Sequence, residues 1–208
     1  MREEQRNYSI GIIGGAGCGK SSVLSILQGQ ADCQVIQADH IGHELMAVGQ
    51  QLYTQVVTVF GNAVTDATGE IDRVKLGAIV FADEGSRIRL NRLSHPLIEA
   101  EIRRRIDALP AVGRLIFIEA ALPRELHMTE YCDEIWWIKA GREIRIKRLM
   151  ETRGYDFLRI QAVLRSQPTD MEYRQMAAVV LENDRTEETL RQRIECELRR
   201  LRGRKLCK

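Results

Sequence analysis

The chain has 208 residues, of which 44% are hydrophobic and 29% are charged, and its formal net charge is +2 at pH 7. These values predict one globular unit with a large core; they do not favour a nucleic-acid-binding protein, and no apolar run is long enough to span a membrane. The first seven residues are too polar for a secretory signal, and the five cysteines form no Cys-x-x-Cys pair. We therefore expect free thiols and a cytoplasmic location.

The first predicted element is a buried strand at Ser9–Ile13, which leads into a glycine-rich loop. Residues 14–21 have the sequence GGAGCGKS, which fits the G-x-x-x-x-G-K-[ST] pattern of the phosphate-binding P-loop. A helix is predicted over Lys20–Gln28, because Val23, Leu24, Ile26 and Leu27 form an apolar face. The motif thus has the strand–loop–helix setting that it requires.

The chemistry of this loop follows from its residue types. Glycines let successive N–H groups turn toward one anion, and the helix that follows adds its positive dipole end. Lys20 is expected to reach the β- and γ-phosphates, and the Ser21 hydroxyl is expected to hold Mg²⁺. The alternative is a turn that binds nothing. The predicted nucleotide-binding residues of this segment are Gly14, Gly15, Ala16, Gly17, Cys18, Gly19, Lys20, Ser21 and Ser22.

Asp39 follows a second predicted strand at Gln34–Ala38. The carboxyl end of such a strand faces the ligand crevice in an open α/β sheet, so this carboxylate can accept the proton of a substrate hydroxyl. The alternative is an N-cap for the helix that begins near His40.

The stretch from Asp39 to Val112 is too long for a simple crossover between strands. We expect a helical insertion there, with a turn at Asp66–Gly69. Pro96 is expected to break the last helical stretch and to begin a helix of its own, which would put His95 at a helix start. A phosphate contact and a capping or core role are then equally open for His95. The helical patterns are Ile41–Val48, Leu52–Phe60, Arg73–Phe81 and Ile88–Leu109.

Three more strands are predicted at Arg114–Glu119, Glu134–Ile138 and Ala177–Leu181. Glu119 ends the first of these, where it can serve as a second Mg²⁺ partner or cap the next loop. Arg148 lies on the helical pattern Arg142–Met150. Arginines that close over a transferring phosphoryl group stabilise its charge, whereas the alternative for Arg148 is a solvated helix face.

The final helical pattern, Thr186–Arg202, opens with acidic residues and closes with basic ones, which suits the helix dipole. We therefore favour a terminal helix with a basic tail over an RNA or membrane patch. The basic residues at this end are Arg199, Arg200, Arg202, Arg204, Lys205 and Lys208.

The alternation of strands and helices predicts an α/β fold, namely a P-loop kinase core of about five parallel strands flanked by helices, with a helical insertion and a helical lid. The predicted core spans 7–39, 112–147 and 177–208, the insertion 40–111 and the lid 148–176.

Several segments together resemble the dephospho-coenzyme A kinase family over nearly the whole chain. No short piece after the P-loop is specific, but their order and spacing are. The segments are 11–21 (GIIGGAGCGKS), 37–39 (QAD), 71–81 (IDRVKLGAIVF), 95–98 (HPLI), 132–138 (CDEIWWI), 148–151 (RLME) and 179–183 (VVLEN).

The resemblance implies an enzyme that uses ATP and Mg²⁺ to phosphorylate the 3′-hydroxyl of dephospho-CoA, the last step of CoA synthesis. Lys20 and Ser21 would then serve ATP and Mg²⁺, Asp39 would orient or deprotonate the hydroxyl, and Arg148 with Arg153 would clamp phosphates. The implied catalytic residues are Lys20, Asp39 and Arg148. The implied acceptor-binding residues are Asp39, Arg73, His95 and Glu119.

The chain departs from the family pattern at three places. Gln37 replaces the first Asp of D-A-D, Ala178 stands where Asp is common, and Pro123-Arg124 is unusual between the acidic ends of segment 119–125. Another small P-loop kinase, with a nucleoside monophosphate or small alcohol as acceptor, is the nearest alternative, followed by a non-catalytic nucleotide-binding module. A GTP-dependent switch is disfavoured because the chain has no N-K-x-D motif. We expect a monomer or weak homo-oligomer without a membrane or nucleic-acid partner.

Overall fold

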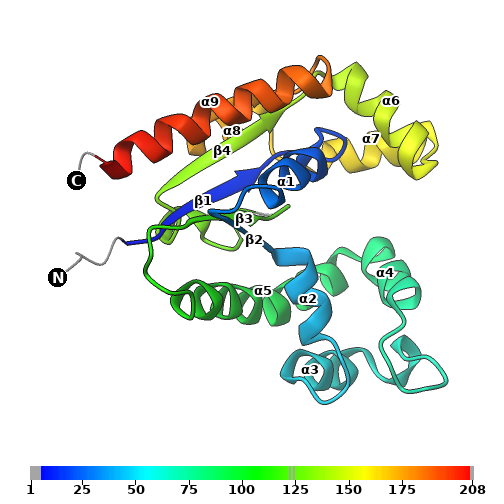
Figure 1. The fold of residues 1–208 in the computed structure, drawn as a ribbon. Coiled ribbons are helices and arrows are strands. Elements are labelled where there is room, and N and C mark those ends of the chain that lie inside the picture. Colours follow the sequence, from blue (N-terminus) through cyan, green and yellow to red (C-terminus); the bar gives the residue numbers. More distant parts are fainter. Residues whose placement is uncertain (1–5, 122, 124, 207–208) are drawn as a thin grey trace. The chain divides into compact units, whose positions relative to one another are not determined.

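The computed structural model describes residues 6–121, 123 and 125–206 and contains a five-stranded sheet in the order β2-β3-β1-β4-β5. Strand β1 runs parallel to both β3 and β4, and β4 runs parallel to β5. The predicted α/β class, with about five parallel strands flanked by helices, is confirmed (Figure 1). The strands are β1 (Tyr8–Ile13), β2 (Cys33–Gln37), β3 (Leu115–Glu119), β4 (Glu134–Lys139) and β5 (Val179–Glu182).

Parallel strands bring their carboxyl ends to one edge of the sheet, and this edge is where an open α/β sheet binds its ligands. The glycine-rich loop follows β1 at that edge. Glu119 is the last residue of the adjacent β3, in register with Ile12. Asn183 follows β5 directly. The topology thus gathers three segments that are far apart in the sequence.

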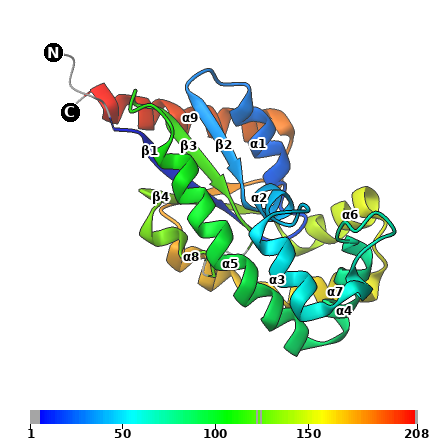
Figure 2. The same cartoon turned by 90° about the horizontal axis from the view of Figure 1, so that it is seen from below.

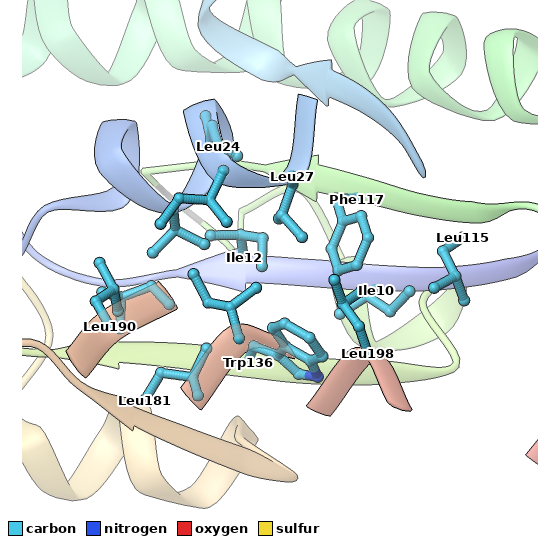
Figure 3. Packing of buried hydrophobic residues seen from close by; sticks show 14 of the residues in the cluster. Ile10, Ile12, Leu24, Leu27, Leu115, Phe117, Trp136, Leu181, Leu190 and Leu198 are labelled. Atoms are coloured by element: carbon cyan, nitrogen blue, oxygen red, sulfur yellow. The ribbon is translucent and has the colours of Figure 1, made fainter. Parts of the chain in front are cut away.

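The hydrophobic core around the sheet lies between one of its faces and helices α1 (Lys20–Gln28) and α9 (Glu187–Leu206). Residues two apart in a strand share a face, so Ile10 and Ile12 of β1 enter the same layer. Figure 3 shows these side chains against those of both helices. The labelled core residues are Ile10, Ile12, Leu24, Leu27, Leu115, Phe117, Trp136, Leu181, Leu190 and Leu198.

Three helices separate β4 from β5: α6 (Arg142–Arg153), α7 (Phe157–Arg165) and α8 (Asp170–Met176). Thr169 begins α8 with a capping box, in which its hydroxyl accepts from the Glu172 N–H and the Glu172 carboxylate accepts from the Thr169 N–H. The ring of Tyr173 stacks on Trp137 of β4, with 5.7 Å between ring centroids. Helix α8 is therefore fixed to the sheet, and the turn before it carries Gln167.

The residues between β2 and β3 form most of a second compact unit, Gln37–Leu109 with Glu125–His127. Helix α5 (Glu84–Asp107) packs against the three other α-helices of this unit (Figure 2). Leu52, Val56, Val64 and Leu76 form its buried centre. The predicted turn at Asp66–Gly69 is confirmed by hydrogen bonds from the Thr68 and Glu70 N–H groups to the Asp66 carboxylate. The elements are α2 (Ala38–Leu45), α3 (Gln51–Phe60), η1 (Asn62–Val64), α4 (Arg73–Ala82) and α5 (Glu84–Asp107).

The expectation that Pro96 begins a helix is wrong, because Pro96 lies inside the continuous helix α5. This helix begins at Glu84, where the Asp83 carboxylate accepts hydrogen bonds from the Gly85 and Ser86 N–H groups. Proline removes one intrahelical hydrogen bond. Packing compensates, since Leu93 and Leu97, on either side of Pro96, both contact the buried centre of the unit. His95 is consequently a mid-helix residue.

Two of the basic residues near the end of the chain form ion pairs within the fold. Arg200 of α9 pairs with Glu134 of β4, and Arg202 pairs with Asp32 at 2.6 Å. These contacts support a terminal helix over a free basic patch. Lys208, Cys207 and Arg124 lie outside the described residues, and α9 ends at Leu206. No helix in the described part of the chain is long and apolar enough to cross a membrane.

Candidate active site

The loop between β1 and α1 has the backbone geometry of an anion cradle. Gly17 and Gly19 have positive φ angles of 77° and 91°, which residues with a side chain rarely adopt. A Cβ on Gly19 would also lie 2.1 Å from Asn183 Nδ2, so only glycine fits there. Helix α1 begins without a side-chain cap, whereas Asp72 caps α4. The first N–H groups of α1 therefore suit an anionic ligand.

Lys20 folds back along this loop toward its beginning. Its Nζ donates a hydrogen bond of 2.9 Å to the Gly14 carbonyl and lies 3.5 Å from Glu119 Oε1. Glu119 is only 7% exposed, and the register of β3 beside β1 holds it there. The structure thus brings together two residues predicted separately, a phosphate-binding lysine and a strand-end carboxylate.

Arg148 of α6 also reaches the loop. Its Nη2 donates to the Asn183 carbonyl at 2.9 Å, and its Nη1 lies 3.4 Å from the Cys18 carbonyl. Asn183 is buried and donates from Nδ2 to the same Cys18 carbonyl at 2.9 Å. Arg153, by contrast, is the exposed last residue of α6 and hydrogen-bonds to no loop residue that the structure describes. Only Arg148 of the predicted arginine pair contacts the loop.

Cys18 serves the loop as a small buried side chain. It is 1% exposed, and its N–H donates to the Gly15 carbonyl at 3.2 Å. Burial raises the pKa of the Cys18 thiol, although the nearby Lys20 ammonium acts in the opposite direction. A reactive thiolate, which the helix start favours in principle, does not fit this environment.

Three contacting residues, Arg145, Gln167 and Asn183, were not predicted as site residues. Arg145 Nε donates to the Ala16 carbonyl at 2.8 Å, and Gln167 Oε1 accepts from the Ala16 N–H at 3.1 Å. Arg145 lies three positions before Arg148 and so shares its face of α6, a spacing that could have indicated it. Gln167 is one residue before Pro168 in a connecting turn, and no sequence pattern marks it.

The remaining predicted acceptor residues belong to the second compact unit, Gln37–Leu109 with Glu125–His127. Asp39 is exposed in the first turn of α2, directly after β2. Arg73 begins α4, with its Nη1 3.1 Å from His43 Nδ1. His95 is half-buried in α5, and burial is the main cause that lowers its pKa.

The site suits Mg²⁺ bound mainly through phosphate oxygens. The Ser21 hydroxyl is exposed at the start of α1, and among the described residues no group of three or more His, Cys, Asp or Glu could hold a metal ion. Mg²⁺ retains several waters and needs only one or two protein oxygens beside nucleotide phosphates. The residues present therefore fit this cation.

Comparison with solved structures assigns the fold. TT1252 from Thermus thermophilus superposes with a TM-score of 0.79 at 26% identity, covering 95% of this chain and 99% of that one. A dephospho-CoA kinase from Campylobacter jejuni gives 0.66 at 22% identity, covering 92% and 95%. Shikimate kinase from Acinetobacter baumannii gives 0.53 at 14% identity, covering 96% of each chain. Together with the loop, these likenesses define a P-loop kinase fold.

The sequence comparisons define the family within that fold. The family model described as dephospho-CoA kinase matches residues 8–188. A dephospho-CoA kinase from Streptococcus mutans is 33% identical over 192 residues, covering 92% of this chain and 96% of the relative. One from Carboxydothermus hydrogenoformans is 36% identical over 186 residues, covering 89% and 90%. The chain belongs to the dephospho-CoA kinase family.

Proposed function

We propose that this protein transfers the γ-phosphoryl group of ATP to the 3′-hydroxyl of dephospho-CoA, giving CoA and ADP. The observation that carries the proposal is the family match over residues 8–188, which begins at the strand leading into the P-loop. The loop geometry supports it independently, because a lysine that folds back over glycine-rich backbone suits a nucleotide polyphosphate.

The roles of the residues follow from their positions. The loop amides and Lys20 bind the phosphates, and the Ser21 hydroxyl would hold Mg²⁺, which when bound neutralises charge on the β- and γ-phosphate oxygens. Arg148 holds the loop from α6 and adds positive charge beside it. Asp39 is the candidate base for the 3′-hydroxyl. Arg73, His95 and Glu119 are the candidate acceptor-binding residues, and Arg153 is a candidate phosphate clamp.

The direct test is an assay of ADP release with ATP, Mg²⁺ and a panel of acceptors: dephospho-CoA, AMP, CMP and shikimate. We expect turnover with dephospho-CoA and a product that carries one more phosphate by mass spectrometry. Turnover with AMP, CMP or shikimate alone would favour another small P-loop kinase. ATP binding without ADP release from any acceptor would favour a non-catalytic nucleotide-binding module.

Asp39→Asn tests the assignment of the base. General bases contribute roughly 10²–10⁴-fold to rate, so we expect kcat to fall by at least about 10²-fold while ATP affinity changes little. Asp107→Asn is the matched control, because Asp107 is an exposed carboxylate at the end of α5 in the same unit. Unchanged kcat in Asp39→Asn would remove Asp39 from the chemistry.

Lys20→Ala tests the phosphate site. This change removes the ammonium group that reaches the Gly14 carbonyl, so we expect weaker binding of both ATP and ADP as well as slower turnover. Equal nucleotide affinity in the variant, measured by calorimetry, would place the polyphosphate elsewhere.

We further infer that the enzyme acts in the cytoplasm as a monomer or weak homo-oligomer, without a membrane or nucleic-acid partner. The near-neutral net charge and the pairing of Arg200 and Arg202 within the fold support this view. Gel filtration over a range of concentrations, with and without added RNA, tests it. Co-elution with RNA or a stable large oligomer would contradict it.

A further inference from the structure

Arg145 approaches the P-loop more closely than the other arginine on its face of α6. A Cβ on Gly15 would lie 2.2 Å from Arg145 Nη2, and a Cβ on Gly17 would lie 2.7 Å from the Arg145 carbonyl. Glycines at these positions thus allow both the backbone and the guanidinium of Arg145 to lie against the loop. The guanidinium covers Gly15 and donates to the Ala16 carbonyl.

Gln167 holds this arginine in place. Its Oε1 accepts hydrogen bonds from Arg145 Nη2 and from the Ala16 N–H. The two polar groups of Ala16 are therefore bound from both sides, the carbonyl by Arg145 and the N–H by Gln167. Because a glutamine amide is neutral, Gln167 fixes the guanidinium without cancelling its charge.

The charge of Arg145 is not balanced by a carboxylate in the described part of the chain. Lys20 pairs with Glu119, whereas no ion pair among residues 6–121, 123 and 125–206 involves Arg145. The Nε proton and one Nη2 proton are used in the bonds to Ala16 and Gln167. The rest of the guanidinium donates to none of the described residues, which leaves its remaining protons for an anion.

Lys20 indicates which phosphate that anion would be. The P-loop lysine reaches the β- and γ-phosphates, and Lys20 Nζ lies at the Gly14 carbonyl, the first residue of the loop. The beginning of the loop is therefore its γ-phosphate end. Arg145 covers the next two residues, Gly15 and Ala16, whereas Arg148 contacts the Cys18 carbonyl nearer the start of α1.

We propose that Arg145 contacts the transferring γ-phosphoryl group and that Gln167 is its positioning residue. The inference rests on the proposed kinase function. In the transfer, the acceptor hydroxyl oxygen forms a bond to the γ-phosphorus while the bond between the γ-phosphorus and the β–γ bridging oxygen breaks. The electron pair leaves with ADP, and the hydroxyl proton passes to the base, for which Asp39 is the candidate. Arg145 keeps its protons and stabilises charge on the equatorial oxygens.

The test compares Arg145→Ala and Arg145→Lys with a control, Arg142→Ala. Arg142 lies one turn earlier on α6, is exposed, and donates a hydrogen bond to Gln161. An arginine that stabilises the transition state contributes roughly 10³–10⁵-fold to kcat, so we expect Arg145→Ala to lose about 10³-fold or more. ADP affinity should stay close to wild type, because ADP lacks the γ-phosphoryl group. Arg145→Lys should recover only part of the rate, and Arg142→Ala should match wild type.

A binding measurement separates this inference from the proposed function. Aluminium fluoride with ADP mimics the transferring phosphoryl group, so it should increase ADP affinity in wild type and in Arg142→Ala but not in Arg145→Ala. The same variants are also compared in the rate of slow ATP hydrolysis without acceptor. Neither the calorimetric measurement nor the hydrolysis rate depends on which acceptor is phosphorylated. If dephospho-CoA proved to be no substrate, the proposed function would fail, but these two measurements would still test whether Arg145 contacts the γ-phosphoryl group.

Gln167→Ala tests the positioning role. We expect a smaller loss of kcat than in Arg145→Ala, an unchanged KM for ATP, and no further loss when both changes are combined, since Gln167 acts through Arg145. Additive losses would overturn the role of Gln167. A kcat for Arg145→Ala within tenfold of wild type, or an equal loss of ADP affinity and kcat in a variant with native circular dichroism, would overturn the role of Arg145.

Discussion

Replacing Arg200 with methionine tests whether the basic C-terminal helix is needed for folding. Arg200 approaches Glu134 Oε1 through Nη2 and Oε2 through Nη1 at 3.3 Å. The Glu134 side chain is 6% exposed and that of Arg200 is 31% exposed. Removing one partner of a buried ion pair costs about 3–5 kcal/mol, because the remaining charge stays buried.

The expected cost lies at the lower end of that range. Glu134 keeps hydrogen bonds from Trp136 Nε1 at 2.6 Å and from the Tyr8 hydroxyl at 3.3 Å, which partly solvate its charge. We expect Arg200→Met to lose about 3 kcal/mol of unfolding free energy, and the Tm to fall by about 6–12 °C for a chain of this size. Urea unfolding gives the free energy, and thermal unfolding gives the Tm.

Two further variants make the experiment specific. Arg199→Met removes the neighbouring exposed arginine and should change stability by less than about 0.5 kcal/mol. Combining Arg200→Met with Glu134→Gln removes the buried charge and should recover much of the loss, because glutamine can still accept from Trp136. A loss below about 1 kcal/mol in Arg200→Met would refute the reasoning from buried charge.

Three other predictions concern the loop and the second unit. Asn183→Ala leaves the Cys18 carbonyl without its 2.9 Å donor, so unfolding free energy should fall by about 1–3 kcal/mol and KM for ATP should rise; unchanged values in urea unfolding and kinetics would contradict this. Iodoacetamide at neutral pH should label exposed Cys196 well before Cys18, whose pKa is raised by burial. Peptide mass spectrometry measures the order of labelling, and earlier labelling of Cys18 would contradict the prediction. Hydrogen bonds from Arg104 and Arg105 lower the pKa of Glu101 from 4.5 to about 2, so its contribution is present above the unfolded pKa and is lost as pH falls toward 2. The stability advantage of wild type over Glu101→Gln in urea should therefore disappear over that interval; an advantage that persisted at pH 2 would refute the linkage.

The sequence by itself determined the parts of this protein that depend on neighbouring residues. The P-loop motif, helix α1 over Lys20–Gln28 and the existence of the five strands follow from spacing and hydrophobic periodicity. The order and spacing of the motifs were also enough to indicate the dephospho-CoA kinase family, which the match over residues 8–188 confirms. The start of helix α9 could likewise be predicted from the acidic residues in its first turn, because negative charge is favourable at a helix N-terminus.

Only the tertiary structure decided which side chains meet at the loop. Arg145, Arg148 and Arg153 share one helix, and the packing of α6 against the loop brings only the first two into contact with it. Gln167 reaches Ala16 across 151 positions of sequence, and Asn183 reaches Cys18 across 165. Periodicity carries no information about such pairs, because the order of strands in the sheet sets them. The same holds for Pro96, which packing on both sides keeps within a continuous helix against its local preference.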